Sequence, residues 1–212
     1  VLFRSRVKAQ GDPHRVIDAY LTDVATDETR QLVDAEAVAR AAQEQPADTP
    51  QGSESPADMF KATEGRWGSR EVEIVDVGLR TEGGQSSRVF DTGSRVEVSF
   101  GFRCQHPVHD VVFGIGVFNT DGVCCYGTNT LIEGGHVESV ESDGRVRFIM
   151  EALDLVEGTY KLDVAVHREN GVPYDYHRLL YTFRMKSTLQ DTGVYRPRHR
   201  WSFEGGVRVS GL

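Results

Sequence analysis

The sequence has few cysteines, and their arrangement is not one that could hold a fold together. There are three, Cys104, Cys124 and Cys125, and the last two are adjacent, where a mutual disulfide is geometrically unfavourable. An odd number without regular spacing excludes the disulfide framework of a small secreted domain. We therefore expect a protein of a reducing compartment, the cytoplasm.

Long apolar runs and clusters of basic residues are also missing. No stretch approaches the roughly 20 apolar residues that span a bilayer. The first residues, VLFRSRVKAQGDP, lack the apolar core and cleavage site of a signal peptide. The 212 residues carry a formal net charge of −8, without a Lys/Arg run. We therefore expect no nucleic acid and no acidic membrane surface as a partner.

Motifs for nucleotide binding, metal binding and covalent catalysis are absent as well. There is no G-x-x-x-x-G-K-[ST] motif, so we expect no P-loop nucleotide and no cofactor in this stretch. His106 and His109 form H-x₂-H, one residue short of the usual zinc spacing. Neither Cys124 nor Cys125 has a base in a motif that would activate a thiol. We predict no catalytic residue and no metal ligand, and therefore no enzyme.

The residues that are present divide the chain into segments of different composition. Over 1–45, Asp12-Pro13 predicts a helix start, with apolar residues at helical spacing behind it and a run of helix formers from 27 onward. Residues 46–61, which begin PADTPQGSESPAD, have the composition of a flexible linker. A β-rich domain is predicted over 62–202, and a tail or exchanged strand over 203–212.

The β-rich segment alternates apolar and polar residues with period two. Half-buried strands are predicted around Val96–Cys104, Val146–Met150, Tyr160–Val166 and Leu179–Met185. Turn signals such as Asp121-Gly122, Asp143-Gly144 and Asn170-Gly171 separate them. With no helical pattern between the strands, the fold class is all-β, an antiparallel Ig-like or jelly-roll sandwich preceded by the helical extension and linker.

The stretch VFNTDGVCCYGTNT at 117–130 predicts a β-hairpin. A two-residue turn at Asp121-Gly122 would place Phe118 opposite Cys125, Gly116 opposite Gly127 and Gly114 opposite Asn129. One face would then belong to the core and carry Phe113, Ile115, Val117, Cys124 and Tyr126. The other face would carry Gly114, Gly116, Phe118, Cys125, Gly127 and Asn129.

The glycine-rich face of the hairpin is the candidate binding site. Glycine in a strand interior often marks the close approach of a ligand or of another backbone. If the neighbouring strand aligns with this face, its small and polar residues extend it. The candidate carbohydrate-binding residues are Ser99, Arg103, Gly114, Gly116, Phe118, Gly127, Asn129 and His167. A packed loop, a partner chain or a bulge would also explain the glycines, and both interpretations stay open.

Four stretches together resemble one family. They are RWGSREVEIVDVGL (66–79), FGIGVFNTDGVCCYGTNT (113–130), EGTYKLDVAVH (157–167) and YDYHRLLYTFRM (174–185) with HRW (199–201). The resemblance is to the C-terminal carbohydrate-binding domain of the ATPase subunit of polysaccharide ABC exporters, the Wzt type. Residues 6–21, RVKAQGDPHRVIDAYL, are similar to the end of an ABC nucleotide-binding domain.

The resemblance implies a dimerising sandwich, with exchange of a terminal strand in many members. It implies recognition of an O-antigen-like polysaccharide, a membrane permease partner, and a place in the cytoplasm against the inner membrane. ATP and Mg²⁺ would belong to an upstream domain. A dimerisation or docking module without glycan contact is the alternative, and a sandwich-fold hydrolase is a third.

Overall fold

The computed structural model describes residues 64–210, together with Leu2–Phe3 and Arg6–Val7, which pair as the short strands β1 and β2. The helix expected after Asp12-Pro13 and the linker expected over 46–61 lie outside the described residues. None of the described residues forms a helix with the length and apolar character needed to cross a bilayer.

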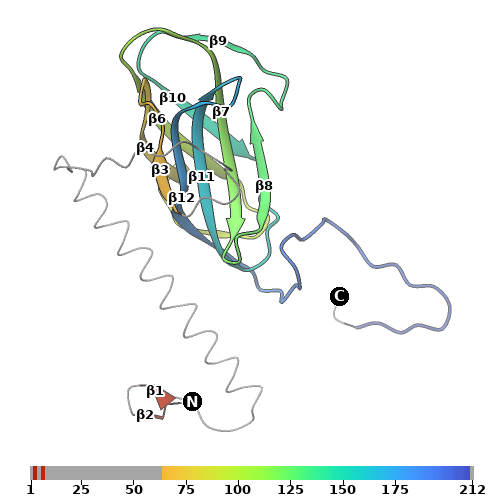
Figure 1. Ribbon diagram of the computed structural model, residues 1–212. Coiled ribbons are helices and arrows are strands. Elements are labelled where there is room, and N and C mark those ends of the chain that lie inside the picture. The colour runs from red at the N-terminus through yellow and green to blue at the C-terminus, as the bar shows by residue number, and fades with distance from the viewer. Residues whose placement is uncertain (1, 4–5, 8–63, 211–212) are drawn as a thin grey trace.

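Residues 64–210 form two sheets packed face to face (Figure 1). The smaller sheet has the order β10-β6-β4, with β4 at Val72–Thr81, β6 at Val96–Cys104 and β10 at Gly144–Met150. The larger, seven-stranded sheet has the order β3-β12-β11-β7-β8, and β5 and β9 pair with β12 and β7. Its strands are β3 (Gly65–Trp67), β5 (Val89–Asp91), β7 (Val108–Asn119), β8 (Cys124–Asn129), β9 (Val137–Val140), β11 (Gly158–Arg168) and β12 (Pro173–Lys186).

Strand pairing is antiparallel throughout these sheets, except that β5 runs parallel to β12. The predicted all-β, two-sheet sandwich is therefore confirmed. Each predicted strand is present, and period-two alternation sends one face of each inward. The core is built from these inward faces; its fully buried members include Val98, Phe100, Val117, Leu162, Val164, Phe183 and Met185.

A buried carboxylate ties the two sheets together at one edge. Asp175 of β12 is fully buried and accepts hydrogen bonds from Arg66 Nη2 (2.6 Å), Arg70 Nη1 (2.7 Å) and the backbone amide of Ile74 in β4 (2.7 Å). These donors, two of them charged, satisfy the hydrogen-bonding capacity of the buried carboxylate. Because Ile74 belongs to β4, the contact joins β12 to the opposite sheet.

The hairpin between β7 and β8 differs from the prediction at its tip. Asn119 N donates to Val123 O and Gly122 takes a positive φ of 78°, which makes a three-residue loop instead of a two-residue one. Phe118 therefore pairs with Cys124 and not with Cys125. A bulge at Cys125 restores the register, so the predicted pairs Gly116–Gly127 and Gly114–Asn129 are confirmed.

Candidate functional site

Six of the eight candidate residues lie on the outer face of the seven-stranded sheet. Phe113, Ile115 and Val117 belong to the core, so the residues that alternate with them on β7 face outward. The strand ladders extend this face into β8 and β11. The residues that it brings together are Gly114, Gly116, Phe118, Gly127, Asn129 and His167.

Ser99 and Arg103 do not join this face, and the expectation that β6 extends it is wrong. β6 pairs with β4 and β10 in the smaller sheet, and the chain crosses between the sheets before β7 begins. Because Val98 and Phe100 point into the core, Ser99 and Arg103 face outward on the opposite side of the sandwich. Ser99 Oγ accepts a hydrogen bond there from Arg145 Nη1 at 3.1 Å.

The chain's own side chains cover the bare backbone at Gly116. A Cβ at this position would lie 3.0 Å from the ring of Phe118. Phe118 is 5% exposed, and the guanidinium carbon of Arg178 lies 4.4 Å from the centre of its ring. Glycine is needed at position 116 because the ring of Phe118 packs over it, and Arg178 covers that ring in turn. The internal packing of the chain therefore explains this glycine, and a bound ligand is not required.

Asp163 of β11 organises the polar groups beside Phe118, and sequence reasoning did not single it out. Its buried carboxylate accepts hydrogen bonds from Leu179 N (2.6 Å), Arg178 Nη1 (3.0 Å) and Tyr176 OH (3.1 Å). Leu179 has a positive φ of 55° at an irregularity in the ladder between β11 and β12, and this turns its amide toward the carboxylate. Strained backbone held by a buried polar network is frequent at functional sites.

Burial is the main influence on the pKa values of Asp163 and Tyr176, and it raises both. It raises the pKa of the Asp163 carboxyl, against the opposing effects of the Leu179 amide, Arg178 and Tyr176. Burial, together with the charge of Asp163, raises the pKa of Tyr176 to about 12. The phenol is therefore a stable hydrogen-bond donor at neutral pH.

An aromatic pair adjoins the network. Trp67 of β3 stacks on Tyr176 with ring centres 4.9 Å apart and planes 9° from parallel, and both side chains are half-buried. Arg178 Nε and Trp67 Nε1 are buried and have no hydrogen-bond partner in the described part of the chain. We call Trp67, Phe118, Asp163, Tyr176 and Arg178 the Asp163 cluster. It combines flat apolar rings with fixed polar groups, which is the chemistry of a small-molecule or sugar site.

The two adjacent cysteines have exchanged the faces predicted for them. Cys124 is exposed on the glycine side of the hairpin, and Cys125 packs partly against the core. The bulge at Cys125 is the reason, because an extra residue reverses which side chain points inward. Burial raises the pKa of the Cys125 thiol, which opposes formation of a nucleophilic thiolate.

Three potential metal ligands do lie together, at the opposite end of β7. One ligand atom from each of Asp110, His136 and Glu169 falls within 4.8 Å of the others. His136 Nδ1 is 2.6 Å from Glu169, however, whereas its Nε2 faces Asp110 at 3.9 Å. Because the two imidazole nitrogens face different carboxylates, the arrangement is that of an imidazole bridging two acids. His106 and His109 are not members of this group.

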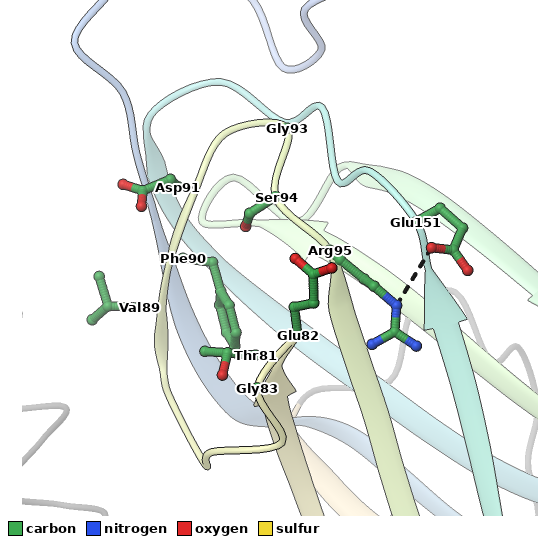
Figure 2. A pocket seen from close by; sticks show the side chains of 10 residues that line it. All are labelled: Thr81, Glu82, Gly83, Val89, Phe90, Asp91, Gly93, Ser94, Arg95 and Glu151. Atoms are coloured by element: carbon green, nitrogen blue, oxygen red, sulfur yellow. Dashed lines mark ion pairs between the residues drawn. The ribbon is translucent and has the colours of Figure 1, made fainter.

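Figure 2 shows a hollow formed by the loops around β5 and β6. The ring of Phe90 and the side chains of Glu82 and Ser94 lie close together there, and Arg95 reaches away from them to Glu151 (3.4 Å). No residue predicted from the sequence lines it. Its aromatic ring is almost completely buried, so this hollow offers no stacking surface.

Known proteins resemble this chain over the sandwich. A family model described as the Wzt C-terminal domain matches residues 63–197. The O-antigen export system ATP-binding protein RfbB of Myxococcus xanthus is 31% identical over 136 residues, which are 64% of this chain and 30% of that protein. The chain therefore spans about a third of the length of this relative.

A solved structure is similar as well. The crystal structure described as the C-terminal domain of Wzt superposes with a TM-score of 0.61 at 21% identity, covering 66% of this chain and 89% of that one. At this identity the likeness concerns the fold, and it supports the two-sheet architecture.

Proposed function

The chain belongs to the Wzt C-terminal domain family, and on that premise we propose that its sandwich recognises an exported polysaccharide without catalysing a reaction on it. The observation that carries the proposal is the Asp163 cluster on the outer face of the seven-stranded sheet. Its positions are held by the strand ladder and by hydrogen bonds, so the face is ordered before any ligand arrives.

The chemistry of this face suits a sugar chain. The half-buried Trp67–Tyr176 pair supplies an apolar surface for the face of a sugar ring. Asn129 and His167, on the two strands that flank β7 on the same face, supply donors and acceptors for hydroxyl groups. Gly127 is exposed and lets a bulky chain approach the backbone.

The wider setting is part of the proposal. The relative RfbB is described as an ATP-binding protein of an O-antigen export system. We propose that this chain comes from a comparable subunit, in which an upstream domain binds ATP and Mg²⁺ and contacts a membrane permease. The sandwich would then meet an O-antigen-like glycan on the cytoplasmic side of the inner membrane, as part of a homodimer.

One observation favours the alternative function, dimerisation or docking without glycan contact. The tail after β12 is extended and exposes large side chains: Trp201 is 68% exposed and stacks on Phe203. Exposed aromatic residues are typical of interfaces. The interface function and glycan recognition use different parts of the chain, so they can be tested separately.

The two tryptophans of the chain provide the test. Calorimetry with the purified surface polysaccharide of the source strain should show at least about tenfold weaker binding for Trp67→Ala, a loss of about 1.4 kcal/mol. Trp201→Ala is the matched control and should bind as the wild type does. Light scattering on both variants reports the oligomeric state. Wild-type protein that does not bind, with a dimer lost in Trp201→Ala, would favour the docking function instead.

A further inference from the structure

The charged side chains around the Asp163 cluster, on the outer face of the seven-stranded sheet, neutralise one another. Four cations face outward from β11 and β12, at positions that alternate with core residues. Three of them lie beside a carboxylate; the pairs are Lys161–Glu64 at 2.7 Å, Arg178–Asp163 at 3.0 Å and Arg184–Glu157 at 3.3 Å. The fourth, Lys186, is exposed at the last residue of β12, ten residues along the strand from Tyr176 of the Asp163 cluster.

Such pairing removes the main attraction that an acidic polysaccharide would find. Recognition of carboxylates or phosphates depends on uncompensated Arg or Lys side chains, which the ligand then pairs. Arg178 is 5% exposed and already bonded to Asp163, so an anion would have to displace a buried carboxylate. The net charge of −8 adds a long-range repulsion against a polyanion.

The interactions that remain on this face are those that uncharged sugars use. Trp67 and Tyr176, which are both half-buried, present stacked rings on which the apolar face of a sugar can lie. We propose that the Asp163 cluster selects an uncharged glycan and discriminates against uronic acids and phosphorylated sugars; this inference rests on the proposed function.

Salt dependence separates the two kinds of ligand. Calorimetry at pH 8 with the source strain's surface polysaccharide should give a Kd that changes less than about twofold between 25 and 500 mM NaCl, because paired charges contribute no ionic attraction. A second sample of the polysaccharide, with its uronic acids reduced and its phosphates removed, should bind as tightly as the untreated one.

A charge variant sharpens the test. Glu64→Gln frees Lys161 on the same face, and it should leave the affinity for the treated polysaccharide within about twofold of the wild-type value. An affinity that falls tenfold or more in high salt, or that is lost after the chemical treatment, would overturn the inference while leaving glycan recognition intact. Absence of binding to both polysaccharide samples would overturn the proposed function itself, and the inference with it.

Discussion

Replacing Asp163 with asparagine should destabilise the sandwich strongly, although the two side chains have almost the same shape. The carboxylate accepts three hydrogen bonds and is the only counter-charge of Arg178 among the described residues. Asparagine keeps one acceptor oxygen but leaves a buried guanidinium uncompensated. Removing one partner of a buried ion pair costs about 3–5 kcal/mol, and we expect a loss near the lower end, about 3 kcal/mol in the free energy of unfolding. Urea denaturation followed by circular dichroism measures it.

A double-mutant cycle shows whether the pair is the cause. Arg178→Met should also destabilise the sandwich, because it leaves the Asp163 carboxylate buried and without its cation. The thioether of the introduced methionine can still pack on Phe118, so the apolar contact is kept. Asp163→Asn combined with Arg178→Met should cost less than the sum of the single changes, by about 1.5 kcal/mol or more. Lys161→Gln breaks a half-exposed pair with Glu64 and serves as the control, with an expected cost below about 1 kcal/mol. The reasoning fails if Asp163→Asn costs no more than this control.

Three further predictions concern single positions. Gly116→Ala should lower the free energy of unfolding in urea by about 1–3 kcal/mol, because its Cβ would meet the ring of Phe118 at 3.0 Å. In Gly127→Ala the nearest neighbour of the Cβ is 3.6 Å away, and the loss should be less than about 0.5 kcal/mol. Equal losses would contradict the packing described. Cys124 should react with a thiol reagent well before Cys125, as mass spectrometry of labelled peptides would show, and the reverse order would argue against the bulge. The pKa of Tyr176 is raised to about 12 from about 10, so its contribution to stability is fully present below pH 10 and is lost as the pH rises through 12. In Tyr176→Phe the free energy of unfolding should therefore fall less steeply between about pH 10 and 12. An unchanged dependence on pH would show that Tyr176 is not the group responsible.

Local patterns were enough to predict the strands and half of the hairpin. Alternation placed Val98 and Phe100 inside and Ser99 outside, because a strand has only two faces. The pairing of Gly116 with Gly127 was predicted correctly even though the turn was not, since a longer loop and a bulge cancel each other in the register. Asp121-Gly122 signals a turn but does not say how many residues it contains.

The order of strands in a sheet was not predictable in the same way. Ser99 and Arg103 were assigned to the site because β6 precedes β7 in the chain, yet the two strands lie in different sheets. Asp163 and Arg178 stand at polar positions of two strands and look like solvated residues until β11 is placed next to β12. A site assembled across strands depends on this order, and it emerges only from how the whole sandwich packs.

The most direct test of glycan recognition follows the indole N–H groups of the two tryptophans by NMR, because the chain has one on the proposed face and one on the tail. The signals can be assigned with Trp201→Phe, and the source strain's surface polysaccharide is then added. The account predicts that the Trp67 signal shifts progressively to saturation while the Trp201 signal stays in place. Binding that moves the Trp201 signal and leaves that of Trp67 unchanged would contradict it.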